Sequence, residues 1–132
     1  MEQWSFERVM IVDDNEIDIF ITSRLIEKTN FARTLQKYLE PENALTYLRE
    51  NQSNIDMLPQ IIFLDIHMPV MNGFQFMEEF GALSWKLKEH CRVYVVSSTC
   101  DERDIDKVRH EEHVVAFQEK PITYEFLDRI KR

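Results

Sequence analysis

Short runs of consecutive apolar residues, separated by segments with helical periodicity, set the pattern of this 132-residue chain. Four of the runs are continuous and rich in β-branched residues, which is typical of strands buried on both faces of a parallel sheet. A fifth run is more polar and fits an edge strand. The predicted strands are Val9–Val12, Thr34–Leu39 (the edge strand), Ile61–Leu64, Val93–Val96 and Val114–Phe117.

Helical spacing fills the gaps between these runs. Asp14 and Asn15 cap a first helix, Pro41 opens a second and Thr123 caps the last. The segment Asp101–Glu111 should be the most solvated helix, because it carries only two apolar anchors. The apolar positions that define the helices are Ile17, Phe20, Ile21, Leu25, Ala44, Leu45, Leu48, Phe74, Met77, Phe80, Ile105, Val108, Phe126, Leu127 and Ile130.

The order of strand then helix, repeated five times, predicts an α/β fold. We expect a single doubly wound, five-stranded parallel sheet with five helices on its two faces and right-handed crossovers. Glu50–Pro59 and Gly81–Cys91 are the expected loops. The length fits one domain of ordinary size.

Composition and charge narrow the functional classes. Sixteen basic and 24 acidic residues give a formal net charge of −8, which disfavours contact with nucleic-acid phosphates or anionic lipid. Two glycines are too few for a dinucleotide or ATP phosphate loop, and two cysteines make no disulfide framework. We expect no leader, because no basic-then-apolar segment opens the chain, and no apolar run reaches membrane length. We therefore expect a cytoplasmic protein with no nucleic-acid or membrane partner.

Polar residues stand where the predicted strands end. Asp13 and Asp14 follow the first strand, Asp65 the third and Ser97 the fourth, and Lys120 lies just beyond the fifth. Ligands of open α/β sheets bind outside the carboxyl ends of the strands, so these side chains should converge. Neighbouring carboxylates repel, and a divalent cation such as Mg²⁺ would keep them ionised. The set suits phosphoryl transfer, with Asp65 as nucleophile because it alone ends the most apolar strand.

The ordered set of motifs resembles the receiver domain of two-component response regulators. The motifs are Asp13-Asp14, Asp65 with Met68-Pro69 and Gly73, Val96-Ser97-Ser98, and Lys120-Pro121, and the likeness covers nearly the whole chain. The resemblance implies a flavodoxin-like fold with strand order 2-1-3-4-5. It also implies a receiver domain over residues 1–132 with no output domain, similar to stand-alone bacterial chemotaxis regulators.

The resemblance assigns the site residues. Asp65 would accept a phosphoryl group from a phosphohistidine, and Lys120 would neutralise its charge. Asp13, Asp14, Asp65 and the backbone carbonyl of His67 would hold Mg²⁺ or Mn²⁺. The peptide bond between Lys120 and Pro121 would be cis.

The resemblance also implies a switch and partners. Ser97 and Phe117 would move on phosphorylation, and the side chains of His67 and Thr99 would tune dephosphorylation. The Asp101–Glu111 helix, the fifth strand and the last helix would then bind a partner. The implied partners are a sensor histidine kinase or histidine phosphotransfer protein, an unidentified downstream protein and a phosphorylation-dependent second copy of the chain.

Two other classes share parts of this pattern. A metal-dependent phosphohydrolase would also form an aspartyl phosphate, but such enzymes commonly place a second acid two residues after the nucleophile, where this chain has His67. A flavodoxin-like electron carrier would have a loop rich in Ser, Thr and Gly after the first strand, where this chain has Asp13-Asp14-Asn15-Glu16. The predicted role is signalling rather than turnover of a separate substrate.

Simpler structural roles also fit the individual residues. The acidic pair and Ser97-Ser98-Thr99 could each cap a helix. His110 and His113 have a spacing that a helix could use for metal, but no further His or Cys accompanies them. Cys100 has only Arg103 as a basic neighbour, so a redox role is disfavoured.

Overall fold

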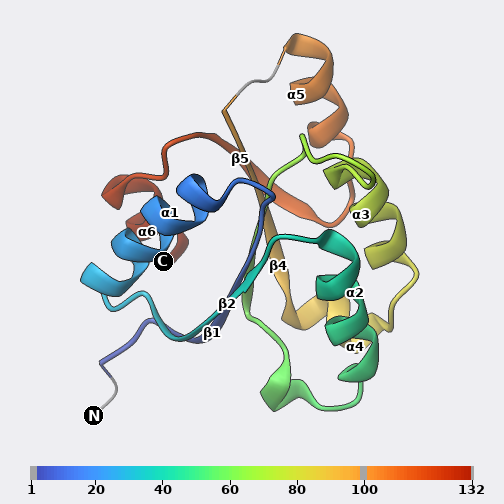
Figure 1. Ribbon diagram of the computed structural model, residues 1–132. Helices are drawn as coiled ribbons and strands as arrows, with labels where there is room; N and C mark the ends of the chain where they lie inside the picture. Colours follow the sequence, from blue (N-terminus) through green and yellow to red (C-terminus); the bar gives the residue numbers. More distant parts are fainter. Residues whose placement is uncertain (1–2, 99–100, 132) are drawn as a thin grey trace.

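Five parallel strands form one sheet with the order β2-β1-β3-β4-β5 (Figure 1), which confirms the predicted order. The structure is a computed structural model and describes residues 3–98 and 101–131. Four predicted runs lie wholly within strands, and the run Thr34–Leu39 does so except for Leu39, which follows the end of its strand; most strands extend beyond the run. The strands are β1 (Phe6–Val12), β2 (Ala32–Tyr38), β3 (Ile61–Leu64), β4 (Arg92–Ser97) and β5 (Val114–Glu119).

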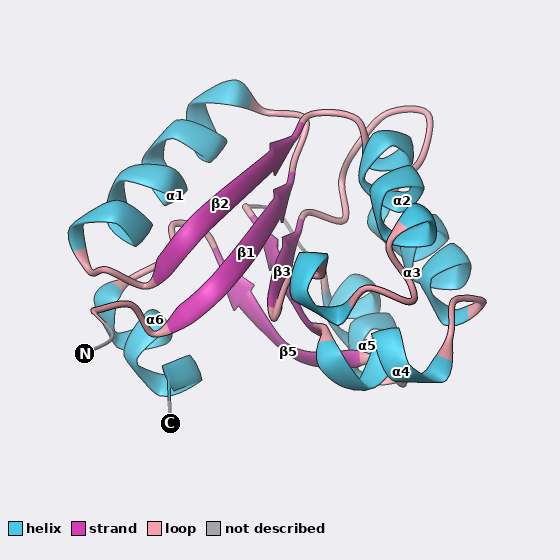
Figure 2. Cartoon of the chain, turned by 90° about the horizontal axis from the view of Figure 1, so that it is seen from below, coloured by secondary structure: helices cyan, strands magenta, loops and turns pink. Residues whose placement is uncertain are grey.

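Helices cover both faces of the sheet, α1 and α6 on one face and α2 to α5 on the other (Figures 1 and 2). A 3₁₀ turn, η1 (Ile55–Met57), lies in the connection before β3. Among the described residues no helix combines the length and apolar character that crossing a membrane requires. The helices are α1 (Glu16–Lys28), α2 (Pro41–Glu50), α3 (Gly73–Gly81), α4 (Trp85–His90), α5 (Glu102–Arg109) and α6 (Tyr124–Lys131).

The sheet separates two apolar layers. Alternate residues of a strand point to opposite faces, so β1 sends Met10 and Val12 toward α2 and α3, and Val9 and Ile11 toward α1 and α6. The four residues of β3 are all buried, as expected for the central strand of a sheet covered on both sides. This burial fixes the carboxyl ends of β1 and β3 side by side, where the candidate site lies.

The three predicted helix starts are confirmed, and a side-chain cap is present at two of them. The Asn15 side chain accepts hydrogen bonds from the first-turn amides of α1, and Pro41 is the first residue of α2. The Thr123 hydroxyl accepts a hydrogen bond from the Phe126 amide at the start of α6, at 3.1 Å. Each cap satisfies an amide that the helix itself leaves unpaired.

The prediction of five helices was wrong, because the expected loop Gly81–Cys91 contains the additional helix α4. The Ser84 side chain caps this helix, and its one buried anchor is Leu87. A six-residue helix with a single anchor shows no apolar periodicity. The face predicted from the fourth helix, fifth strand and fifth helix is accordingly formed by α5, β5 and α6.

The prediction that the run Val114–Phe117 is buried on both faces was also wrong. Strand β5 lies at the edge of the sheet, and Val115 is 54% exposed. A run of four apolar residues occurs both in edge strands and in central strands. The pattern of this run therefore did not indicate the position of its strand in the sheet. The polar run now in β2 was correctly predicted to form the other edge.

The first helix exists as predicted, but three of the four apolar positions that indicated it face outward, and only Leu25 packs against the core. Ile17, Phe20 and Ile21 are exposed, whereas Ile19 and Ile26 pack against the sheet. The helix carries apolar residues on two sides, so periodicity identified the helix without identifying its buried side. The exposed side is the outer face of α1, defined here as Ile17, Phe20 and Ile21.

Candidate functional site

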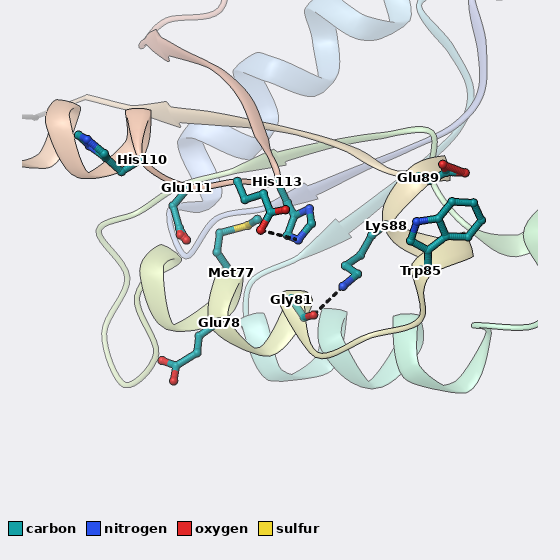
Figure 3. Close-up of a pocket in the computed structure, with 10 residues that line it drawn as sticks. Met77, Glu78, Gly81, Trp85, Lys88, Glu89, His110, Glu111 and His113 are labelled. Atoms are coloured by element: carbon teal, nitrogen blue, oxygen red, sulfur yellow. Dashed lines mark hydrogen bonds and ion pairs between the residues drawn. The ribbon is translucent and has the colours of Figure 1, made fainter.

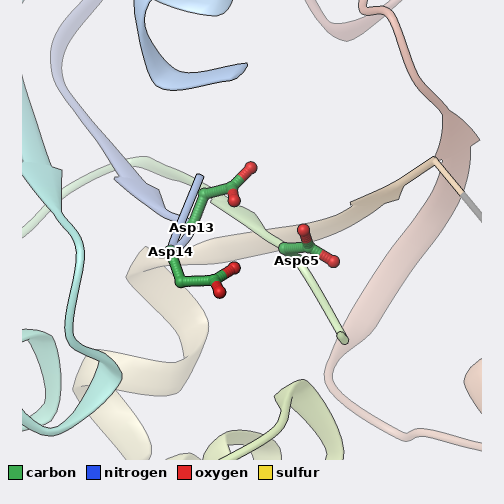
Figure 4. A group of neighbouring side chains, drawn as sticks. All are labelled: Asp13, Asp14 and Asp65. Carbon is green, nitrogen blue, oxygen red and sulfur yellow. The ribbon is translucent and has the colours of Figure 1, made fainter. Parts of the chain in front are cut away.

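Asp13, Asp14 and Asp65 meet at the carboxyl edge of the sheet (Figure 4). Strands β1 and β3 are paired so that Val12 lies opposite Leu64, and the acids follow directly. One carboxylate oxygen of each acid lies within 4.8 Å of the others. Asp13 and Asp65 are buried, and Asp14 is exposed. The convergence predicted from the strand ends is therefore present.

Lys120, which follows strand β5, contacts two of these three acids. Its Nζ donates to Asp13 Oδ2 at 2.7 Å and to Asp65 Oδ2 at 2.9 Å. The backbone after β5 places this side chain, since the Lys120 amide donates to the Ser97 carbonyl at 3.0 Å and the Lys120–Pro121 bond is cis as expected. The ammonium group is thus held against the two buried carboxylates.

Backbone amides bind the remaining oxygens of these two acids. The Asn15 amide donates to Asp13 Oδ1 at 2.9 Å, and the His67 amide donates to Asp65 Oδ1 at 2.9 Å. Each buried carboxylate therefore has one oxygen on the backbone and one on Lys120. These hydrogen bonds orient both side chains before any ligand arrives.

Burial and neighbouring charges shift the pKa values of Asp13 and Lys120 in opposite directions. Burial raises the pKa of Asp13 to about 6, against the lowering effect of Lys120 and of the Asn15 amide. Burial alone would lower the pKa of Lys120, but its hydrogen bonds to carboxylates outweigh burial and raise that pKa above its ordinary value. The Lys120 ammonium group therefore stays charged. The site combines this one basic group with a larger number of acidic groups.

Lys120 has a further partner that the sequence analysis missed. Asp18, in the first turn of α1, accepts from Lys120 Nζ through its Oδ2 at 2.7 Å. The first turn of a helix that follows β1 lies at the carboxyl edge of the sheet, so an acid there is placed at the same edge as Asp13 and Asp14. An acidic residue soon after the acidic pair was the available signal, and it was not used.

The predicted switch residues lie on the neighbouring strands β4 and β5. Ser97 ends β4 and is 1% exposed. Phe117 is half-buried on β5 and packs against the cluster of Ile66, Val95 and Val108. Thr99, the second predicted tuning residue, and Cys100 lie outside the described residues.

The side chain of His67 points toward α5. Its Nε2 lies 3.3 Å from Asp104 Oδ2, while the His67 backbone stays at the site through its amide. His67 also lines an open hollow of about 560 Å³ together with Asp14, Asp18, Asp65 and other residues. The imidazole therefore stands beside the entrance to Asp65.

Exposed apolar residues border the entrance. Ile17, from the outer face of α1, lines the same hollow as Asp65. Val70, in the loop after β3, is 95% exposed and lines an adjoining hollow that reaches Asp14. Val70 also has a φ of 67°, a left-handed conformation that is strained for a β-branched residue.

A separate hollow of about 620 Å³ lies between the end of α3, α4 and the turn before β5 (Figure 3). Trp85, Lys88 and His113 are among its lining residues, and the Lys88 ammonium donates to the Gly81 carbonyl at 2.8 Å. His110 and His113 both line it, but no group of potential metal ligands among the described residues includes them. The acids of the candidate site do not contribute to this hollow.

Comparison with known proteins gives the class that this fold and site define. The family model of the response regulator receiver domain matches residues 9–130. The chain belongs to the response regulator receiver domain family. This membership disfavours the phosphohydrolase and electron-carrier alternatives.

Solved structures and curated relatives agree with this assignment. A two-component response regulator from Cytophaga hutchinsonii is 27% identical with a TM-score of 0.86, covering 95% of this chain and 93% of that one. A response regulator receiver protein from Dyadobacter fermentans is also 27% identical, with a TM-score of 0.85 and 94% coverage of both chains. The response regulator ARR2 of Arabidopsis thaliana is 35% identical over 74 residues, which are 56% of this chain and 10% of ARR2.

The relatives differ in length and source. This chain spans less than a fifth of the length of the Arabidopsis regulators that it matches. Because these relatives are plant proteins, the similarity does not restrict the chain to bacteria, and a bacterial source stays a prediction.

Proposed function

We propose that Asp65 is the phosphoacceptor of this receiver domain and takes its phosphoryl group from a phosphohistidine. The observation that carries the proposal is the convergence of Asp13, Asp14 and Asp65 on one another, with Lys120 bound to Asp13 and Asp65. Asp65 is the central candidate because it is buried, its carboxylate is oriented from both sides, and the hollow beside it opens to solvent.

The bonds that form and break in the reaction belong only to the donor and Asp65. An Asp65 carboxylate oxygen attacks phosphorus, the bond from phosphorus to the donor imidazole nitrogen breaks, and the electron pair of that bond stays on the imidazole. The product is an acyl phosphate on Asp65. Lys120 donates a hydrogen bond to the phosphoryl oxygens and offsets their charge, which is the main demand of phosphoryl transfer.

The donor set fits a divalent cation. Three carboxylates offer oxygens within 4.8 Å of one another, and carboxylate oxygens suit Mg²⁺ or Mn²⁺. We propose Asp13, Asp14, Asp65 and the His67 backbone carbonyl as the protein ligands. When bound, the ion supplies positive charge to the phosphoryl oxygens. A receiver domain of the histidine kinase CKI1 from Arabidopsis thaliana, 23% identical, was solved in complex with Mg²⁺.

The entrance favours a protein as the phosphodonor. Ile17, on the outer face of α1, and Val70 present exposed apolar area beside the acids, and such area next to a site marks a protein interface. A sensor histidine kinase or a histidine phosphotransfer protein carries the phosphohistidine that the reaction requires. The outer face of α1 would contact that protein while its histidine reaches Asp65.

The response to phosphorylation would pass through β4 and β5. We propose that the Ser97 hydroxyl moves toward the phosphoryl group and that Phe117 follows it inward, since both lie on strands that border the site. The face formed by α5, β5 and α6 would then bind a downstream protein or a second copy of the chain. Val115 on this face is 54% exposed and so is available to a partner. The protein CheY of Borrelia burgdorferi, 21% identical, was solved in a complex with CheX.

The test uses a small phosphodonor, so that no kinase has to be known. The protein is incubated with acetyl phosphate, with Mg²⁺ or with a chelator, and its intact mass is measured. We expect one phosphoryl adduct with Mg²⁺, little with the chelator, and none in Asp65→Asn. An adduct that persists in Asp65→Asn would show that Asp65 is not the acceptor.

A further inference from the structure

Lys120 is shared among more carboxylates than the proposed reaction requires. Its Nζ donates to Asp13, Asp18 and Asp65 at 2.7, 2.7 and 2.9 Å. A lysine ammonium has three N–H donors and no more. All of its donors are therefore occupied by carboxylate oxygens before a phosphoryl group arrives.

Asp18 acts on the lysine and not on the cation site. The acids whose oxygens lie within 4.8 Å of one another are Asp13, Asp14 and Asp65, and Asp18 is not among them. It approaches Lys120 from α1, where its amide donates to the Asn15 cap at 3.1 Å. The α1 cap thus fixes Asp18, whose side chain is 28% exposed, against a lysine side chain that is 11% exposed.

The charges of this arrangement oppose uptake of an anion. Three carboxylates contact one ammonium group, and a fourth, Asp14, lies close to two of them. A phosphoryl group brings further negative charge to Asp65 and needs an N–H from Lys120. At the low effective dielectric of a partly buried site, an additional carboxylate 2.7 Å from Lys120 Nζ offsets much of the lysine's charge.

We propose that Asp18 is a positioning residue that restrains Lys120 and thereby slows phosphoryl uptake by Asp65. This inference rests on the proposed function of Asp65. Loss of the Asp18 charge leaves Lys120 freer to donate to the phosphoryl oxygens. Uptake begins from the unphosphorylated protein, which does not yet carry the charge of the phosphoryl group. Loss of the Asp18 charge therefore increases the rate of uptake. Hydrolysis begins from the acyl phosphate, which already carries the charge of the phosphoryl group. The rate of hydrolysis therefore changes less than the rate of uptake.

The experiment compares Asp18→Asn with Glu16→Gln. Both variants remove one negative charge from the first turn of α1, and both residues line the hollow beside Asp65, but Glu16 has no contact with Lys120. Phosphoryl uptake from acetyl phosphate at saturating Mg²⁺ is followed by intact mass. In this reaction Asp65 displaces acetate, which leaves with the electron pair of its bond to phosphorus. The half-life of the acyl phosphate is measured after the donor is removed.

We expect Asp18→Asn to take up the phosphoryl group about threefold to tenfold faster than the wild type, with a much smaller change in half-life. Glu16→Gln should change the uptake rate by less than about twofold, because its charge is screened by solvent. Partial unfolding lowers uptake, so a structural defect cannot produce the expected increase. Asp18→Ser provides a second variant without the charge, and thermal unfolding checks that each variant is folded.

The outcomes separate this inference from the function on which it rests. If the wild type takes up no phosphoryl group, the proposed function fails. If the wild type is modified at Asp65 and folded Asp18→Asn and Asp18→Ser react at the wild-type rate or more slowly, Asp18 does not restrain Lys120 and this inference alone is overturned. Equal acceleration by Glu16→Gln would also overturn it, since the effect would then belong to net charge and not to the contact.

Discussion

The imidazole Nε2 of His67 lies 3.3 Å from Oδ2 of Asp104. His67 follows the candidate phosphoacceptor by two residues, and Asp104 lies in the first turn of α5. The contact therefore joins the loop beside Asp65 to a helix of the proposed partner-binding face. Both side chains are partly exposed, at 46% and 26%, so the contact is a link between two elements rather than a buried anchor.

Replacement of His67 by Ala should release this link. We expect changes in the backbone amide chemical shifts of α5, with a loss of unfolding free energy of no more than about 1 kcal/mol because the pair is partly exposed. The acyl phosphate should also hydrolyse faster, since the imidazole stands beside the entrance to Asp65. Arg103→Ala is the control, because Arg103 pairs with Asp101 at the surface of the same turn. Unchanged α5 shifts in His67→Ala would contradict the link.

The close approach at Gly73 predicts a destabilising substitution next to the site. A Cβ at Gly73 would lie 2.6 Å from Ile66 Cα and 2.9 Å from the Asp65 carbonyl oxygen, and both are backbone atoms. Gly73→Ala should therefore cost about 1–3 kcal/mol of unfolding free energy and slow phosphoryl uptake by moving Asp65. Gly81→Ala, where a Cβ meets nothing within 4 Å, should keep or increase stability. Denaturant unfolding measures the free energy of unfolding of both variants. Equal unfolding free energies for Gly73→Ala and Gly81→Ala would contradict the prediction.

Most of the fold was predictable because its signals are local. The buried strands are continuous apolar runs, and the helix starts carry Asn15, Pro41 and Thr123. The buried side of α1 was not predictable, since apolar residues lie on two sides of that helix and only packing against the sheet decides between them. Helix α4 was missed because its single buried anchor, Leu87, gives no repeat.

The candidate site was predictable as far as strand ends define it. The acids after β1 and β3 and the lysine after β5 follow from the rule that parallel strands end at one edge. The link between Asp18 and Lys120 joins residues 102 positions apart, and its partner lies in a helix rather than at a strand end. The direction of the His67 side chain likewise depends on where α5 packs. The sequence around His67 does not predict that packing.

The outer face of α1 predicts a difference between protein and small donors. Phe20 is 62% exposed, so Phe20→Ser should change the unfolding free energy by no more than about 0.5 kcal/mol. It should leave uptake from acetyl phosphate unchanged and slow transfer from a phosphorylated histidine phosphotransfer protein. Ile26→Ala is the contrast on the buried side, where Ile26 is 1% exposed, and it should cost about 2–5 kcal/mol. Equal slowing of both donors by Phe20→Ser would argue against a docking role.

The buried thiol of Cys91 gives a measure of native packing near the sheet. Burial raises the pKa of Cys91 to about 12, and its side chain is 2% exposed. In a Cys100→Ser background Cys91 is the one remaining thiol. A thiol-specific reagent at pH 8 should modify it far more slowly in the folded protein than in denaturant, because both access and thiolate are lacking. Rapid modification of the folded protein would contradict the burial of this residue.

The most direct measurement identifies which carboxylate carries the phosphoryl group. Borohydride reduces an aspartyl phosphate to homoserine, which peptide sequencing by mass spectrometry locates. After treatment with acetyl phosphate and Mg²⁺, the account predicts homoserine at position 65 and unchanged aspartate at positions 13, 14 and 18. Homoserine at any of those three positions, with Asp65 unmodified, would contradict it.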